Sequence, residues 1–124
     1  MKYYIMFVLT ILANMANSHE FTPTYPTLNH SYVDGVMVTQ MRLFNKRDDV
    51  EFYEISVFDG EWNRIPFASE SRIIKVEYLK TKFFDVYIRE SDMEKAEYIC
   101  TQSKLKKKDV QSTGISSRIC SRIK

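Results

Sequence analysis

Two histidines, His19 and His30, are the candidate metal ligands of this sequence. If the chain is cut after Ser18, His19 becomes the first residue and carries a free α-amino group beside its imidazole. An amine and a ring nitrogen from one residue, with the His30 imidazole as a further ligand, form the nitrogen-rich set that Cu(II) prefers. A copper-binding secreted protein that uses His19 and His30 is therefore one alternative function.

The sequence lacks the motifs of the common enzyme classes. Its three glycines stand singly, so it contains no phosphate-cradling loop and no dinucleotide-binding fingerprint. It also lacks the His-Glu-x-x-His motif of zinc proteases and the Gly-x-Ser-x-Gly motif of hydrolases. We therefore expect a protein that is not an enzyme, with no catalytic residues and no cofactor.

The chain contains two cysteines, Cys100 and Cys120. In an oxidising compartment we expect them to form one disulfide, because two cysteines allow a single intramolecular bridge. Closing a loop of this size stabilises a domain by about 3 kcal/mol on the chain-entropy model. There is no Cys-x-x-Cys motif, so a metal or redox role is not indicated.

Residues 1–18 have the three parts of a secretory signal peptide. Lys2 supplies positive charge, residues 3–13 are apolar, and Ala16 and Ser18 are small residues suited to a cleavage site. A membrane-spanning helix needs about 20 apolar residues, and this apolar segment is shorter. We expect cleavage after Ser18 or Ala16, export to the periplasm or the cell exterior, and no membrane span in the mature chain.

Basic residues are concentrated near the C-terminal end. Residues 100–124 contain seven Lys or Arg and one acidic residue, whereas residues 19–99 contain ten Lys or Arg and fifteen Asp or Glu. The two interpretations are a solvated loop that faces an acidic body and a docking patch for a partner. Nucleic-acid binding is not predicted, because no aromatic residues are interleaved with these charges. The candidate partner-binding residues are Lys104, Lys106, Lys107, Lys108, Arg118 and Arg122.

The body of the chain alternates apolar and polar side chains with the period of β-strands. The expected strands are residues 36–43, 50–58, 72–79, 83–88, 96–101 and 115–123. Pro23 and Pro26 limit residues 19–26 to an edge strand or an arm, and Pro66 excludes a central strand at residues 62–67. The charged turn at residues 45–49 closes either a hairpin or a link between two sheets.

Strands this short and this evenly spaced are typical of a β-sandwich. We expect an all-β chain whose immunoglobulin-like antiparallel β-sandwich covers residues 19–101. A signal-peptide helix, residues 1–18, precedes this domain and is removed. A basic C-terminal segment, residues 102–124, follows the domain, and the disulfide ties it back.

Parts of the sequence resemble the N-terminal immunoglobulin-like domain of periplasmic pilus chaperones. The resemblance covers about residues 32–101. It depends on the Leu-Phe-Asn turn at residues 43–45, the Ile-Pro-Phe segment at residues 65–67, and the strands at residues 52–59, 84–89 and 97–101. It implies the sandwich fold. Residues 20–39 contain no lysine or arginine, so the family's basic anchor for a subunit carboxylate is not matched.

The whole chain is also similar to short, uncharacterised exported proteins of marine tailed phages, on its Phe-Thr-Pro-Thr-Tyr-Pro opening at residues 21–26 and its closing residues 116–124. Because the sequence has the pattern of a sandwich and lacks catalytic motifs, we expect a non-catalytic accessory module that binds a protein through a sheet edge or the basic tail. The alternatives are the copper-binding protein and a structural component of a virion.

Overall fold

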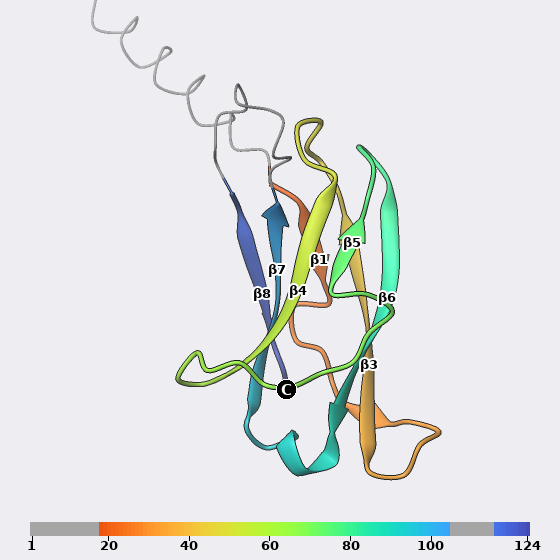
Figure 1. The fold of residues 1–124 in the computed structure, drawn as a ribbon, viewed down its shortest axis with the longest axis vertical. Coiled ribbons are helices and arrows are strands. Elements are labelled where there is room, and N and C mark those ends of the chain that lie inside the picture. The colour runs from red at the N-terminus through yellow and green to blue at the C-terminus, as the bar shows by residue number, and fades with distance from the viewer. Residues whose placement is uncertain (1–17, 105–115) are drawn as a thin grey trace, which may run out of the picture.

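The computed structural model describes residues 18–104 and 116–124, which form two antiparallel β-sheets packed face to face (Figure 1). The expected signal peptide and Lys106, Lys107 and Lys108 lie outside the described residues. In sheet A, β3 pairs with β6 along one edge and with β1 and β2 along the other. Sheet B has the order β5-β4-β7-β8. The strands are β1 (Glu20–Thr22), β2 (Asn29–His30), β3 (Val36–Phe44), β4 (Phe52–Asp59), β5 (Ile73–Lys75), β6 (Thr81–Arg89), β7 (Ala96–Lys104) and β8 (Arg118–Arg122).

The sheets enclose the core with the alternate residues that the sequence pattern indicates. In β4 the side chains of Tyr53, Ile55 and Val57 are fully buried, because successive residues of a strand point to opposite faces. Met41 and Leu43 of β3 meet them from sheet A. The all-β sandwich expected from the sequence is confirmed.

Asn45 fixes the place where the chain crosses from sheet A to sheet B. Its fully buried side-chain amide donates to the carbonyls of Val50 (2.7 Å) and Val76 (2.8 Å). Its side-chain oxygen accepts from the N–H of Arg47 (2.9 Å) and from the hydroxyl of Tyr53. β3 belongs to sheet A and β4 belongs to sheet B. The turn at residues 45–49 is therefore a link between sheets and not a hairpin.

The strand expected at residues 72–79 is shorter in the structure. β5 spans Ile73–Lys75, with Ile74 buried and Ile73 exposed. The chain then turns, because the N–H of Lys80 donates to the carbonyl of Glu77 (3.0 Å). Leu79 has a φ of 59°, and its N–H donates to the carbonyl of Asn45 (2.8 Å). Leu79 therefore belongs to a turn and not to a strand, and its side chain is exposed.

The C-terminal end of the chain is an integral strand of sheet B. Cys120 of β8 lies opposite Cys100 of β7, and the two form a disulfide. Residues 19–26 were expected to form an edge strand or an arm. Within them Glu20–Thr22 form β1, which pairs with β3 and buries Phe21. In the described part of the chain, no helix has the length and apolar character needed to cross a membrane.

Candidate functional site: the outer face of sheet B

Three of the six candidate basic residues lie on one surface, the outer face of sheet B. Ile99 and Thr101 of β7 point into the core, so Lys104 belongs to the alternate, outward-facing set of that strand. On β8, Arg118 and Arg122 flank Cys120 at two-residue spacing and are paired with Gln102 and Tyr98. The structure thus brings Lys104, Arg118 and Arg122 onto one face.

Positive charge predominates on this face. By register, Lys75 of β5 joins Lys104, Arg118 and Arg122, and Glu54 of β4 is the acidic residue of the described strands that faces the same way. Glu54 is already neutralised, because its carboxylate lies 3.0 Å from the Lys104 ammonium group and 3.7 Å from the Arg64 guanidinium group. The hydrogen bond from Lys104 is the main reason that the pKa of Glu54 is lowered.

Aromatic rings are interleaved with these charges. Trp62 stacks on Tyr98 with ring centroids 4.4 Å apart and planes 6° from parallel, and its ring is 5.7 Å from that of Phe58. The Arg118 guanidinium carbon lies 4.5 Å above the Phe58 ring and 5.3 Å from the Trp62 ring. Arg64 approaches Phe58 at 5.7 Å. We call these five residues the aromatic–arginine cluster.

A tight turn after β4 presents Trp62 to this cluster. The Asp59 carboxylate accepts hydrogen bonds from the N–H groups of Asn63 (2.8 Å) and Glu61 (2.9 Å), and these bonds, the one from Asn63 most, lower the pKa of Asp59. Trp62 has a φ of 66°, in the left-handed region that costs a side-chain-bearing residue about 1–2 kcal/mol. The indole is nevertheless 51% exposed, so the turn holds a strained tryptophan where solvent or a partner can reach it.

Sequence reasoning identified Arg118 but missed the rings around it. Phe58 and Tyr98 are 40 positions apart, and the pairing of β4 with β7 places them side by side. A signal was present in the sequence: Phe58 occupies an outward position of a strand whose inward residues are already apolar. The proximity of Trp62 to Tyr98, in contrast, depends on the shape of the turn.

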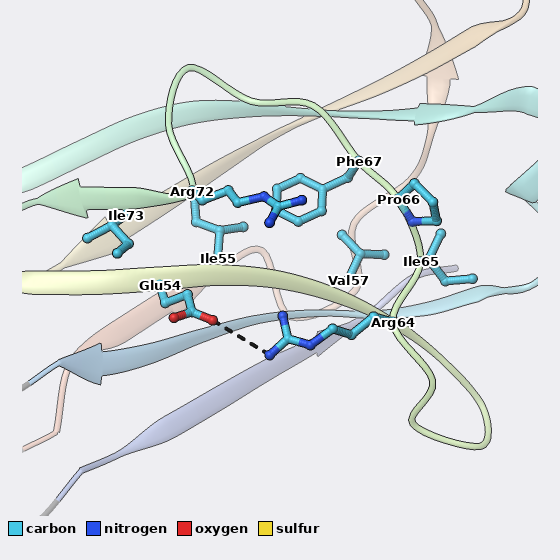
Figure 2. A pocket seen from close by; sticks show the side chains of 9 residues that line it. All are labelled: Glu54, Ile55, Val57, Arg64, Ile65, Pro66, Phe67, Arg72 and Ile73. Carbon is cyan, nitrogen blue, oxygen red and sulfur yellow. Dashed lines mark ion pairs between the residues drawn. The ribbon is translucent and has the colours of Figure 1, made fainter.

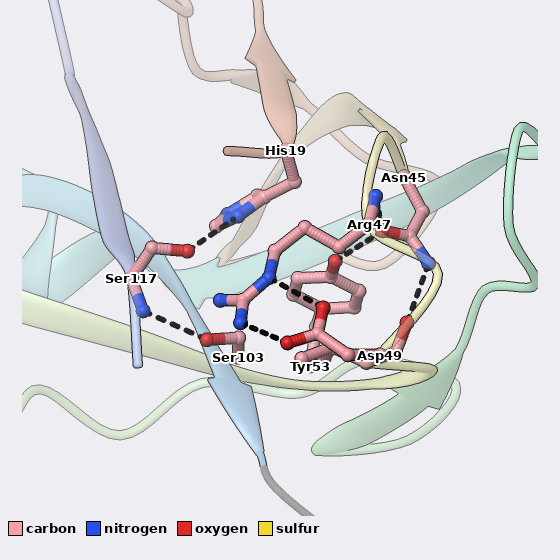
Figure 3. A network of polar contacts seen from close by, with 8 residues as sticks. His19, Asn45, Arg47, Asp49, Tyr53, Ser103 and Ser117 are labelled. Atoms are coloured by element: carbon pink, nitrogen blue, oxygen red, sulfur yellow. Dashed lines mark hydrogen bonds and ion pairs between the residues drawn. The ribbon is translucent and has the colours of Figure 1, made fainter. Parts of the chain in front are cut away.

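His19, the first candidate metal ligand, is buried in a polar network (Figure 3). Its Nε2 lies 2.8 Å from the Thr101 hydroxyl and its Nδ1 lies 3.3 Å from the Ser117 hydroxyl. Its ring packs against Tyr53 with centroids 4.6 Å apart. Burial, followed by the positive charge of Arg47, lowers the pKa of His19 to about 4. Both ring nitrogens are thus held by hydroxyl groups, and the ring is neutral at physiological pH.

The structure does not bring His30 to His19. His30 is exposed on β2 and is paired with Met37, whereas Glu20, the neighbour of His19, is paired with Phe44. Seven residues along β3 separate these pairs by about 23 Å. Within residues 18–104 and 116–124, no three His, Cys, Asp or Glu side chains are grouped in a way that could hold a metal ion.

Solved structures with a similar fold include two chaperones. Over 86% of this chain, the E. coli chaperone DraB matches with a TM-score of 0.63 and 13% identity. The periplasmic chaperone SfaE matches over 86% of the chain with a TM-score of 0.53 and 13% identity. The sandwich is of the PapD-like, immunoglobulin type. The chain spans about half the length of these two chaperones, 53% of DraB and 56% of SfaE.

A similar fold also occurs in a domain of a human protein. PapD-like domain 7 of human CEP192 matches 89% of this chain with a TM-score of 0.57 and 6% identity, and the match covers 87% of that domain. Similarities at this level of identity establish the fold and leave the function open. No family model and no curated protein matches the sequence, so the resemblance to phage proteins stays a prediction.

Proposed function

We propose that this protein is an exported, non-catalytic module that binds an acidic surface of another protein through the outer face of sheet B. The observation that carries the proposal is the position of Arg118. Its guanidinium group lies over Phe58 and Trp62, and no carboxylate of the described residues pairs with it. Tryptophan, tyrosine and arginine are the residue types that most often dominate binding energy at protein interfaces.

The charge of the face favours an acidic partner. Lys75, Lys104, Arg118 and Arg122 outnumber Glu54, whose charge is already compensated. A partner carboxylate would meet guanidinium groups held in place by ring stacking, which reduces the entropy lost on binding. Lys106, Lys107 and Lys108 follow Lys104 in the sequence and remain candidate partner-binding residues.

Export is part of this proposal and has its own support. The sequence of residues 1–18 has the pattern of a signal peptide, and Cys100 and Cys120 form a disulfide of the kind that persists in oxidising compartments. Amino-terminal sequencing of the protein from a periplasmic fraction should yield a chain that begins at His19 or Asn17. Recovery of the intact chain from the cytosol with both thiols free would contradict export.

The binding function is tested with immobilised protein and periplasmic extracts. We expect a retained protein that elutes at about 0.5 M salt, because the contact is electrostatic. Retention should be lost in Arg118→Glu and reduced about tenfold in Trp62→Ala. Arg42→Glu makes the same charge change at an exposed position of β3 in sheet A and should retain the partner. Capture that all three variants share equally, or no capture at all, would contradict the proposal.

A further inference from the structure

The turn between β5 and β6 presents two apolar residues to solvent. The N–H of Lys80 closes this turn by donating to the carbonyl of Glu77 (3.0 Å). Between these residues stand Tyr78, which is 50% exposed, and Leu79, which is 55% exposed. Neither residue belongs to the hydrophobic core or to the apolar residues packed against it. The fold therefore leaves an apolar tip uncovered.

Leu79 occupies a strained backbone position at this tip. Its φ of 59° lies in the left-handed region, where a turn usually places glycine or asparagine. The hydrogen bond that fixes the position runs from the N–H of Leu79 to the carbonyl of Asn45 (2.8 Å), and any residue with a backbone N–H could form it. The leucine side chain thus carries a conformational cost and contributes no core packing. Strain without such compensation indicates a role outside the fold.

Lysines surround the tip. A hollow of about 220 Å³ beside the turn is lined by Lys75, Lys80 and Lys82. In the part of the chain that the structure describes, Lys75 and Lys80 form no salt bridge, and the contact of Lys82 with Glu70 is long (3.6 Å). Glu77 is the acidic residue within the turn itself. An apolar tip beside free ammonium groups suits a partner that is apolar within and anionic at its surface.

The turn lies at the end of the sandwich where the chain enters its first strand (Figure 1). Thr81, the first residue of β6, is paired with Phe44 of β3, and Phe44 is also paired with Glu20, the first residue of β1. The expected signal peptide, residues 1–18, comes directly before this point in the sequence. The apolar segment of a signal peptide lies in the membrane during export. This end of the domain therefore faces that membrane, a step that rests on the export included in the proposed function.

A second copy of the chain is a poorer occupant than a lipid bilayer. The tip would need an apolar hollow without positive charge on the other copy. The hollow of about 450 Å³ beside β4 does not meet this need, because Ile55 and Val57 are buried and Arg64 and Arg72 line it (Figure 2). Its two arginines would repel the lysines around the tip. A bilayer, in contrast, accepts a convex apolar tip without a preformed pocket.

We propose that the turn at Tyr78 and Leu79 docks on the surface of a lipid bilayer that contains anionic phospholipids. Leu79 would enter the apolar boundary below the headgroups, and the amphipathic ring of Tyr78 would lie at the headgroup level. Lys75, Lys80 and Lys82 would contact lipid phosphates, each strengthening the binding about fivefold. The contact is peripheral and reversible, because so small an apolar surface holds far less firmly than a membrane-spanning helix.

The docking turn is separate from the aromatic–arginine cluster. Phe52, at the start of β4, is paired with Lys75, whereas Trp62 follows the other end of β4, at Asp59. The length of β4, about 23 Å, separates the two sites. Trp62→Ala should therefore weaken binding of an acidic protein partner and leave membrane binding unchanged, and Leu79→Asn should do the reverse. Failure of one proposal is thus distinguishable from failure of the other.

The test is co-sedimentation of the exported protein with phospholipid vesicles. Vesicles of phosphatidylcholine with about one-third phosphatidylglycerol should bind the protein at millimolar lipid concentrations. Vesicles of phosphatidylcholine alone should bind it at least about tenfold more weakly. Raising the salt concentration from about 0.1 M to about 0.5 M should weaken the binding several-fold, because salt screens the lysines.

Matched variants test the apolar tip and its charges. Leu79→Asn should bind the anionic vesicles about tenfold more weakly without loss of stability, because asparagine tolerates a positive φ. Val33→Asn removes a similarly exposed side chain (63%) at the opposite end of the sandwich and should bind as the wild type does. Lys80→Glu should weaken the binding at least about tenfold. Lys95→Glu makes the same charge change at the opposite end, next to β7, and should stay within about twofold of the wild type.

The position of the tip in the lipid has its own readout. With Trp62→Phe in the background, Tyr78→Trp should shift its fluorescence to shorter wavelength when anionic vesicles are added. The wild type, whose single tryptophan is Trp62, should keep its emission unchanged. The proposal is overturned if no vesicles bind, if vesicles with and without phosphatidylglycerol bind equally, or if Leu79→Asn binds as tightly as the wild type.

Discussion

Acidification from about pH 7 to about pH 5 should destabilise the domain by about 2 kcal/mol, because His19 must stay uncharged in its buried site. In the unfolded chain the His19 pKa is near 6.5, and in the folded domain it is about 4. Between these two values the unfolded state binds a proton that the native state excludes. Stability is therefore full above about pH 6.5 and falls as the pH approaches 4.

The magnitude follows from the shift. A difference of about 2.5 pKa units corresponds to about 3 kcal/mol when the whole interval is crossed. About 2 kcal/mol of this is expressed between pH 7 and pH 5. The carboxylates of Asp49 and Glu54, which are partly exposed, contribute at lower pH. Hydrogen bonds from Arg47 and Lys104, respectively, lower their pKa values from ordinary values of 3.8 and 4.5. The interval above about pH 5 therefore isolates the histidine.

The assay is urea unfolding at several pH values for the wild type, His19→Gln and His30→Gln. His19→Gln should be less stable at pH 7, since it loses part of the contact with Thr101, Ser117 and Tyr53, and it should lose the pH dependence above about pH 5. His30→Gln, at an exposed position, should behave as the wild type. The explanation is refuted if His19→Gln retains the full pH dependence, or if the wild type changes by less than about 0.5 kcal/mol.

Three further predictions concern stability. Asn45→Ala should destabilise the domain by at least about 3 kcal/mol in urea unfolding, because it leaves two buried carbonyls and a buried N–H without partners; a loss below about 1 kcal/mol would contradict the role of Asn45 at the crossing between sheets. Replacing Cys100 and Cys120 together by serine should remove about 3 kcal/mol of unfolding free energy, and an unchanged urea midpoint would show that the bridge is not stabilising. Gly35→Ala should lower thermal stability by about 1–2 kcal/mol through backbone strain alone, because Gly35 has a φ of 80° and an added Cβ would contact nothing within 4 Å; no change in the melting temperature would contradict this.

Much of the sandwich could be predicted from local patterns. The inward-facing residues of β3 and β4 follow from alternation, since a strand that buries one face must place apolar residues at every second position. Pro66 correctly excluded residues 62–67 from a central strand, because it cannot donate to a ladder. The strand at residues 72–79 was predicted too long. Its alternation continues past Lys75, but hydrogen bonds from Lys80 and Leu79 turn the chain toward β6.

The candidate site was predicted in part. The excess of basic residues near the C-terminus identified Lys104, Arg118 and Arg122, which share one face of sheet B in the structure. The alternative function, copper binding, needs His19 to be an accessible ligand, and the structure instead buries it between Thr101, Ser117 and Tyr53. Nothing near His19 in the sequence indicates this burial, because Thr101 is 82 positions away.

The sequence by itself determined which side of each strand is buried and which two cysteines can pair, because these depend on alternation and composition. The tertiary structure decided which distant residues meet: Arg118 lies over Phe58 and Trp62, and His19 lies between Thr101 and Ser117. Strand register and the path of a loop between two sheets set those contacts. Both result from packing of the whole chain, and no short stretch of sequence contains them.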